Sequence, residues 1–210
     1  MDSATCLAEA ARLGPVVALT VAYGQRHRRE LRSARALARR FRVARHLLVR
    51  LPLGALAPSA LTDRRIAVPR PGATPGRIPA TYVPARNTIL LALALALAES
   101  SGARAIYLGI NAVDYSGYPD CRPEFLRAFA RLTRWATRVG TEERRGIPIR
   151  APLLRLSKRQ IVERGNRLGV PWELTWSCYR GGRRPCGRCD ACRLRAIGFR
   201  EAGTPDPLVA

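Results

Sequence analysis

The sequence predicts an α/β fold with a doubly wound parallel sheet, followed by a C-terminal zinc knuckle. Two observations predict the sheet: short apolar runs alternate with helix-like segments, and short turns separate most of them. A third observation predicts the knuckle, because four cysteines lie within fifteen residues near the C-terminus. A chain of 210 residues that is 47% hydrophobic can build one substantial core with a small appended subdomain. We therefore expect an α/β domain over 1–176, a knuckle with a closing helix over 177–203, and a disordered tail over 204–210.

The first part of the chain reads as helix, strand, helix, strand and a long loop. The first helix has Asp2 or Ser3 in position to cap it. The first strand is a nearly continuous apolar run, as expected for a buried parallel strand. The second helix gathers its apolar side chains on one face, and the loop is rich in Pro and Gly. These elements are expected at residues 3–13, 15–23, 26–41, 46–51 and 52–85.

The second part continues with four helices and one strand. Its first helix has a Leu-Ala alternation that imitates a strand, but Leu and Ala are strong helix formers. Asn87 would cap this helix, and Gly102 would end it. Pro123 suits the first turn of the next helix, and Ser157 would cap the one after it. The helices are expected at 87–101, 123–139, 157–168 and 190–199, and the strand at 104–110.

The cysteine pattern is Cys178-x7-Cys186-x2-Cys189-x2-Cys192. Glycines and a proline between the cysteines allow the chain to fold back, and four thiolates form the closed tetrahedral shell of structural zinc. An iron–sulfur cluster also takes four cysteines, but the Cys-Pro that closes a ferredoxin run is absent. Disulfides would suit a secreted chain, and no signal peptide precedes this one. Zinc is therefore the expected metal, and it leaves no position for a catalytic water.

The formal net charge of +22 bears on the choice of partner. Such a charge favours nucleic acid, but the arginines are spread along the chain, and few aromatic residues lie between them. Lys158 is the only lysine, which indicates a bias of the genome towards Arg. We expect RNA binding to be non-specific at most. The longest apolar run is too short to span a bilayer, so we expect a cytoplasmic protein without membrane contact.

Polar side chains follow the expected strands, where ligands bind in parallel sheets. Gln25, Arg26 and His27 could face a ligand from a helix start, or form an ordinary polar turn. The densest polar stretch, 111–124, could form hydrogen bonds with the donor and acceptor edge of a heterocycle, or it could be an ordinary loop. Its candidate residues are Asn111, Asp114, Tyr115, Tyr118, Asp120, Cys121 and Arg122.

Two basic residues also stand out by position. Arg86, with Asn87 beside it, precedes a strongly apolar helix, so it needs an anionic partner or an aqueous cleft. That partner could be a ligand or an internal carboxylate. Lys158 lies in the first turn of a helix, which attracts anions and suits phosphate neutralisation. The alternative for Lys158 is a solvated surface side chain.

Taken together, these segments resemble the 7-cyano-7-deazaguanine synthases of queuosine precursor biosynthesis. The resemblance covers residues 1 to about 203. It is carried by the strings YGQRHRREL, TYVPARNT, GINAVDYSGYPDCRPEF and LTWSCY, and by the four cysteines. It implies a pyrophosphatase-type, adenine nucleotide alpha-hydrolase-like ATP-binding fold, a homodimer, and a structural zinc on Cys178, Cys186, Cys189 and Cys192.

The resemblance also implies a reaction. ATP adenylates 7-carboxy-7-deazaguanine, ammonia forms the amide, and a second activation dehydrates the amide to the nitrile, with release of AMP and pyrophosphate. Mg²⁺ would bridge the phosphates. Catalysis is assigned to Lys158, Asp2 and Ser3, and ATP binding to Asp2, Ser3, Gln25, Arg26 and His27. Base recognition is assigned to Arg86, Asn87, Asn111, Asp114, Tyr115, Tyr118, Asp120, Cys121 and Arg122.

One departure from the family lies at the start of the chain. The family's ATP loop reads Ser-Gly-Gly-x-Asp-Ser after a first strand, and Met1 falls on the x position. Only Asp2 and Ser3 of that loop are present. Either the start codon is placed too far downstream or the chain is a truncated remnant. In both cases we expect the 210 residues as written to bind ATP poorly.

Two other functions compete with this reading. The high positive charge favours a tRNA-modifying ATPase of the same fold, whereas the heterocycle-like stretch 111–124 disfavours it. A zinc-stabilised RNA-binding remnant without an ATP site is the non-enzymatic alternative.

Overall fold

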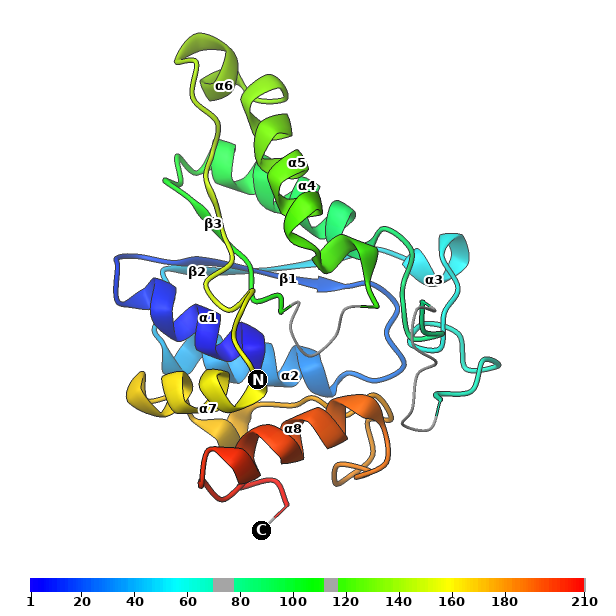
Figure 1. Cartoon of the computed structure of the whole chain (residues 1–210). Coiled ribbons are helices and arrows are strands. Elements are labelled where there is room, and N and C mark those ends of the chain that lie inside the picture. Colours follow the sequence, from blue (N-terminus) through cyan, green and yellow to red (C-terminus); the bar gives the residue numbers. More distant parts are fainter. Residues whose placement is uncertain (70–77, 112–116, 210) are drawn as a thin grey trace.

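The chain is described by a computed structural model that covers residues 1–69, 78–111 and 117–209 (Figure 1). It is an α/β fold whose strands pair in parallel. Its elements are α1 (Asp2–Ala11), β1 (Val17–Ala22), α2 (Arg29–Arg40), β2 (Arg45–Arg50), α3 (Leu53–Leu56), α4 (Arg86–Ser100), β3 (Ile106–Tyr107), η1 (Pro119–Cys121), α5 (Pro123–Trp135), α6 (Arg138–Glu142), β4 (Ile149–Arg150), α7 (Lys158–Arg167), η2 (Trp172–Leu174) and α8 (Asp190–Glu201). None of the helices in these residues is long and apolar enough to cross a membrane.

The strands form two separate parallel pairs. β1 pairs with β2 over its whole length, from Val17 opposite Arg45 to Ala22 opposite Arg50. β3 pairs with β4 at two positions. In the described part of the chain no ladder joins the two pairs. The parallel α/β class is thus confirmed, and the expected single sheet is seen only as two parallel pairs.

The strand expected over 104–110 is wrong in length. β3 holds only two residues, because a strand extends as far as a neighbour accepts its hydrogen bonds. The Ile106 N–H donates to Pro148, and the Leu108 N–H donates to Arg150. The partner strand β4 was not predicted, since two residues are too few to show an alternating pattern.

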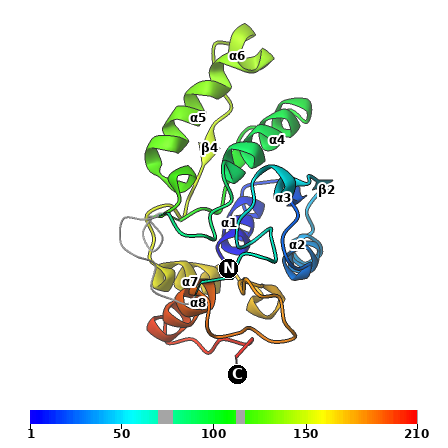
Figure 2. The same ribbon diagram turned by 90° about the vertical axis from the view of Figure 1, so that its right-hand side faces the viewer.

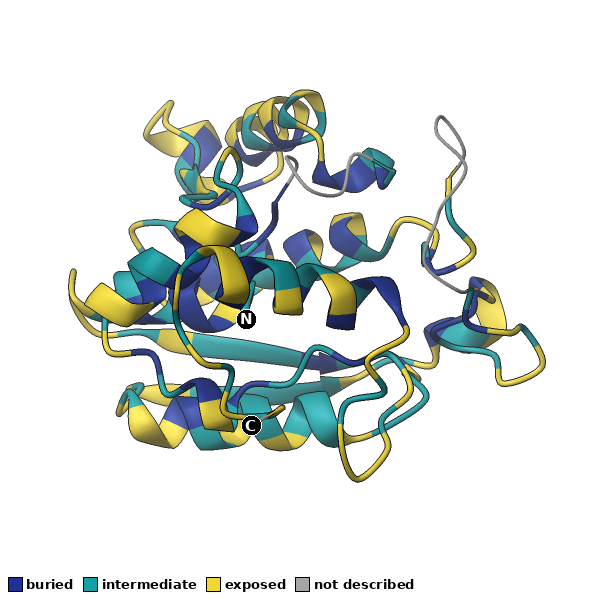
Figure 3. Ribbon diagram, turned by 60° about the horizontal axis from the view of Figure 1, so that its bottom comes forward, coloured by how far each residue is buried: buried dark blue, intermediate teal, exposed yellow. Residues whose placement is uncertain are grey.

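β1 is less buried than its apolar sequence predicts. Val21 is its one buried residue, and β2 has only half-buried and exposed positions (Figure 3). A fully buried parallel strand needs a neighbour on both edges and cover on both faces. Among the described strands, β1 has β2 alone as its neighbour. The strand expected over 15–23 is therefore present as β1, but the expectation that it is buried was wrong.

The helices gather at two ends of the molecule, with β1 and β2 between them (Figures 1 and 2). At one end, α4 and α5 enclose a cluster that includes Leu91, Ile106 and Phe129. At the other end, α7 packs against α1 and α8, and their shared cluster contains Val162 and Phe199. This arrangement brings the start of α1 beside the start of α7.

The expected helix starts are correct to within a few residues, but two caps differ. Ser157 caps α7, and its capping box with Gln160 is complete. The Leu-Ala run is the helix α4, as predicted. It begins at Arg86 after Ala85, which has a φ of +53°, so Asn87 lies inside the first turn and its side chain is directed elsewhere. α1 begins at Asp2 with no side-chain cap, so neither Asp2 nor Ser3 acts as its N-cap.

The helix expected over 123–139 is two helices, α5 and α6. Thr137 separates them, because its hydroxyl accepts a hydrogen bond from the Gly140 N–H and so caps a new helix. The long loop 52–85 contains the one-turn helix α3 in its described part.

The tail was expected to be disordered, and this is incorrect for 204–209. Arg195, buried in α8, binds Asp206 through two hydrogen bonds of 2.7 and 2.8 Å. The same guanidinium donates to the Thr175 hydroxyl at 2.6 Å. A buried guanidinium needs an anionic partner, and the tail supplies it.

Candidate functional site

A cavity of about 380 Å³ lies where three helices begin. The first turns of α1 and α4 and the first residue of α7 all line it, together with residues 108–111 after β3. Helix N-termini carry partial positive charge and unsatisfied N–H groups, so three of them around one space favour an anion. The predicted site residues that line the cavity are Asp2, Ser3, Arg86, Asn87, Asn111, Tyr118, Cys121 and Lys158.

Lys158 and Asp2 form an ion pair at the cavity wall. Lys158 Nζ lies 2.7 Å from Asp2 Oδ2, although the two residues are 156 positions apart. Lys158 is buried and Asp2 is half-buried. Asp2 Oδ1 is also buried, and it has no hydrogen-bond partner among the described residues. The pair therefore keeps a charged ammonium in a nearly dry position and leaves one carboxylate oxygen for a ligand.

Two glycines allow the backbones to approach closely enough for this pairing. A Cβ on Gly109 would lie 2.7 Å from Ser3 Cα, so any side chain would push α1 away from the segment after β3. A Cβ on Gly198 would lie 2.8 Å from Lys158 Cβ, so α8 packs on α7 at this point only because residue 198 lacks a side chain.

Asn87 ties α4 to the polar stretch 117–122. Its N–H donates to Asp120 Oδ2 at 2.9 Å, and its Nδ2 donates to the Asp120 carbonyl at 3.1 Å. The same amide lies 3.2 Å from Cys121 Sγ. Burial raises the pKa of the Cys121 thiol to about 11, so this cysteine lines the cavity as a neutral thiol near neutral pH.

Asn111 and Tyr118 are also held by hydrogen bonds. Asn111 Nδ2 donates to the carbonyls of Leu153 and Leu156, just before α7. This contact fixes the segment that presents Lys158. Tyr118 OH is 2.7 Å from Thr81 Oγ1. The hydrogen bonds of both side chains thus fix the position of the cavity wall.

Arg86 interacts with Tyr23 at the end of β1. Its Nη1 lies 3.4 Å from the phenol oxygen, and its guanidinium carbon is 5.6 Å from the ring centroid. Burial raises the pKa of the Tyr23 phenol, so the phenol stays neutral. No carboxylate lies within ion-pair distance of Arg86 in the described structure. The internal salt bridge considered from the sequence is therefore not seen there.

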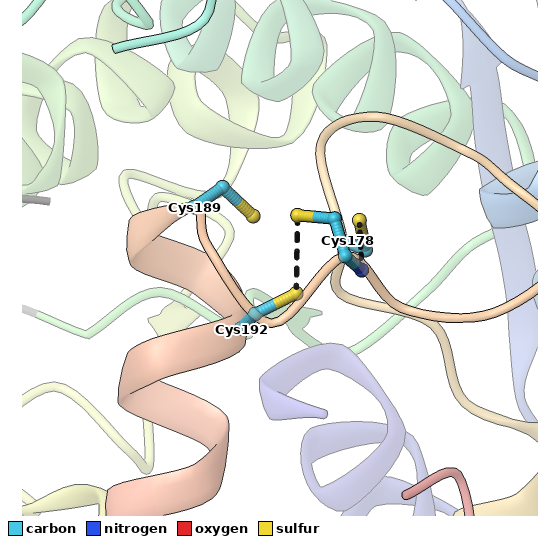
Figure 4. A group of neighbouring side chains, drawn as sticks. Cys178, Cys189 and Cys192 are labelled. Carbon is cyan, nitrogen blue, oxygen red and sulfur yellow. Dashed lines mark hydrogen bonds between the residues drawn. The ribbon is translucent and has the colours of Figure 1, made fainter. Parts of the chain in front are cut away.

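The four knuckle cysteines form a second candidate site. Their Sγ atoms all lie within 4.8 Å of one another, and the sulfurs of Cys178, Cys189 and Cys192 turn towards a common centre (Figure 4). Cys186 Sγ and Cys192 Sγ are 3.9 Å apart. A tetrahedral zinc with Zn–S bonds of about 2.3 Å needs sulfurs about 3.8 Å apart, so the cluster fits zinc.

Backbone N–H groups also point at the sulfurs. Cys178 Sγ accepts from the N–H groups of Arg180 and Cys186, both at 3.4 Å, and Cys186 Sγ accepts from Arg188. These backbone N–H groups favour thiolates at Cys178 and Cys186, and the thiolate is the form that binds a metal.

Comparison with known proteins identifies the family of this chain. The family described as "Queuosine biosynthesis protein QueC" matches residues 1–203. The chain belongs to this family. The resemblance inferred from the sequence is thereby confirmed, and the match spans both the cavity and the knuckle.

Several relatives share more than half of their aligned residues with this chain. The 7-cyano-7-deazaguanine synthase of Anaeromyxobacter sp. (strain Fw109-5) is 58% identical over 214 residues, covering 100% of this chain and 91% of the relative. That of Aromatoleum aromaticum is 55% identical over 210 residues, covering 99% and 92%. That of Synechococcus sp. (strain CC9605) is 51% identical over 207 residues, covering 98% and 91%.

Some predicted residues of this QueC family member lie away from the cavity. Arg26 donates to the carbonyls of Asp63, Arg64 and Ile66, so it clamps the long loop. Gln25 accepts from the Tyr23 N–H in a tight turn. His27 packs edge-on against Trp176 of the knuckle region. Arg122 is exposed before α5. Asp114 and Tyr115 lie outside the described residues. Asp120 does not line the cavity, but its carboxylate accepts a hydrogen bond from Asn87, which does.

The cavity also has walls that the sequence analysis did not identify. Glu30 lines it from α2, and Arg195 lines it from α8. Glu30 could have been singled out as the one acidic residue of a helix rich in arginine. Arg195 gave no such signal, because it is one of many arginines and its burial depends on Asp206.

Proposed function

We propose that this chain converts 7-carboxy-7-deazaguanine and ammonia to 7-cyano-7-deazaguanine with ATP, and the product is the one that the names of its relatives give. The observation that carries the proposal is the cavity: three helix N-termini and the ion pair of buried Lys158 with half-buried Asp2 line one space, within a chain that belongs to the QueC family. This arrangement suits a substrate whose reacting end and cosubstrate are both anionic.

The chemistry needs an activated carboxylate. A carboxylate oxygen attacks the α-phosphorus of ATP, releases pyrophosphate and forms an acyl adenylate. Ammonia then displaces AMP and gives the amide. A second ATP adenylates the amide oxygen with release of pyrophosphate, and loss of a proton and AMP leaves the nitrile. The protein's task in this scheme is to position the reactants and to neutralise phosphate charge.

The described residues have distinct roles in this scheme. Lys158 neutralises charge on the phosphates, and the first-turn N–H groups of α1 at Asp2 and Ser3 approach the same oxygens. Asp2 Oδ1, buried and without a partner in the described residues, is an oxygen ligand suited to Mg²⁺ on the nucleotide. Arg86, Asn87, Asn111, Tyr118 and Cys121 form the base-binding wall, and Asp120 fixes Asn87. Asp114, Tyr115, Arg122, Gln25, Arg26 and His27 remain assigned by resemblance alone.

The zinc on the four cysteines would be structural. The knuckle residues that flank the cysteines also supply one wall of the cavity, including Ser177, Tyr179 and Ala191. A closed four-thiolate site would order this wall without taking part in the reaction. We accordingly assign residues 1–176 to the domain that binds the nucleotide and the base, and residues 177–203 to the knuckle.

Other features follow from family membership. We infer a homodimer and a cytoplasmic location, and an adenine nucleotide alpha-hydrolase-like sheet as the complete fold. Binding of nucleic acid would be non-specific, because it rests on charge alone.

The proposal is tested by measuring nitrile formation directly. Purified protein is incubated with 7-carboxy-7-deazaguanine, ammonium chloride and Mg-ATP, and mass spectrometry follows the acid, the amide and the nitrile. Mg-ATP is supplied in excess, because weak ATP binding is expected from the sequence of the ATP loop. The expected result is formation of the nitrile, with AMP and pyrophosphate formed in proportion to it. ATP hydrolysis that requires tRNA, with no nitrile formed, would contradict the proposal and favour a tRNA-modifying ATPase.

A further inference from the structure

Glu30 is a carboxylate on the cavity wall without a partner of its own. It lies in the first turns of α2, is half-buried and lines the cavity. Within the described residues, no hydrogen bond or ion pair reaches its carboxylate oxygens. A carboxylate out of water normally has donors around it, so the position suits a ligand that supplies them.

The neighbouring positive groups do not pair with Glu30. His27, Arg86 and the Met1 amino group act on it electrostatically, but Arg86 directs its guanidinium to Tyr23. Burial raises the pKa of the Glu30 carboxyl, and these three groups only partly oppose the effect. The wall of the cavity therefore holds a hydrogen-bond acceptor, Glu30, and a donor, Arg86, that are not bonded to each other.

This pair matches one edge of the base in the proposed substrate. The 2-amino-4-oxo-pyrimidine ring of a 7-deazaguanine presents two adjacent N–H donors, from N2 and N1, and then a carbonyl acceptor. A carboxylate accepts from both donors at once, and a guanidinium donates to the carbonyl. A base that lacks the 2-amino group offers only one of the two donors.

We propose that Glu30 is the residue that selects the 2-aminopyrimidinone edge, with Arg86 on the adjoining carbonyl. The inference rests on the proposed function for the identity of the base. Glu30 is thus a specificity residue that contacts substrate, and it has no part in activating the carboxylate.

The test compares two ligands and two variants by calorimetry. The ligands are 7-carboxy-7-deazaguanine and its analogue without the 2-amino group. The wild-type protein should bind the first at least about tenfold more tightly, since one charge-assisted hydrogen bond separates them. Glu30→Gln loses one acceptor and adds a donor, so it should bind the two ligands within about threefold of each other.

Glu9→Gln is the matched control. Glu9 is also a half-buried carboxylate, but it pairs with Arg164 outside the cavity, so this variant should keep the wild-type preference. The inference is overturned if wild-type protein binds both ligands equally, or if Glu30→Gln keeps the preference. Turnover is measured in parallel: selective binding without nitrile formation refutes the proposed function and leaves the role of Glu30 standing.

Discussion

Lys158 shows how one side chain can link two distant parts of the chain. It is the only lysine in a sequence with 37 basic residues, and it is buried beside Asp2 and Gly198. A lysine ammonium is a compact charge on a slim stem, whereas a guanidinium is a wide planar group. The close contact with Gly198 and the short distance to Asp2 suit the slimmer group.

We expect Lys158→Ala to lower kcat/KM for nitrile formation by about 100-fold or more, because a phosphate-neutralising charge is lost. The free energy of unfolding should also fall, by about 2–4 kcal/mol, because Asp2 is left without its partner. Urea unfolding and steady-state kinetics measure the two effects. The double variant with Asp2→Asn should recover most of the stability and none of the activity.

The control for this prediction is the next residue. Arg159 is exposed and pairs with Glu163 on the surface of α7, so Arg159→Ala should change the stability by under about 1 kcal/mol. Its turnover should match that of the wild type. Unchanged turnover in Lys158→Ala would remove this lysine from the mechanism.

At the scale of elements, the knuckle is the clearest case of a segment that needs an external stabiliser. Its cysteines sit between turns, and the neighbouring arginines 180, 183, 184 and 188 are exposed. The small cluster around Cys178 and Cys189 includes Ala60 and Val68 from the long loop. A metal at the cysteines would thus order both the knuckle and part of that loop.

We expect purified protein to contain about one equivalent of zinc, and Cys189→Ala to lose it. Because the knuckle forms a wall of the cavity, the variant should unfold at lower temperature and lose turnover in proportion to lost folded protein. Metal analysis and thermal unfolding measure these effects.

Cys6→Ala provides the comparison, since Cys6 is buried in α1 away from the knuckle. This variant should retain its zinc. Iron with labile sulfide in the wild-type protein would show that the cluster is not a zinc site.

At the scale of the whole molecule, the basic residues far outnumber the acidic ones, by 37 to 15. Arg32, Arg35 and Arg39 recur every three or four residues along α2, and all three are exposed. No carboxylate pairs with any of them in the described part of the chain. A helix face of this kind attracts polyanions without reading sequence.

We expect the protein to bind tRNA weakly at low salt, with an affinity that falls about tenfold or more from about 50 mM to about 200 mM salt. Reversing Arg32, Arg35 and Arg39 to Glu should reduce the slope of log affinity against log salt. Fluorescence anisotropy with labelled tRNA measures it, and nitrile formation should be unaffected.

The matched variant reverses three arginines that already have carboxylate partners, Arg127, Arg138 and Arg145. It changes the net charge by the same amount, so a smaller effect on the slope would locate binding at α2. Equal effects would show that net charge alone is responsible. Absence of any binding at low salt would contradict the prediction.

The sequence by itself determined the features that depend on local pattern. Ser157 and Gln160 identify the start of α7, the Leu-Ala run identifies α4, and cysteine spacing identifies the metal cluster. Each signal lies within a few residues, where backbone geometry alone sets which groups can meet.

Only the tertiary structure decided what meets across long separations. The Asp2–Lys158 pair, the buried Arg195–Asp206 pair and the place of Glu30 in the cavity all depend on how helices pack. The tail was wrongly expected to be disordered, because its short sequence with Pro205 and Pro207 gives no sign that Asp206 pairs with a buried arginine. The burial of β1 and the length of β3 were wrongly predicted for the same physical reason: a strand is defined by its neighbours, and a single sequence does not contain the pairing.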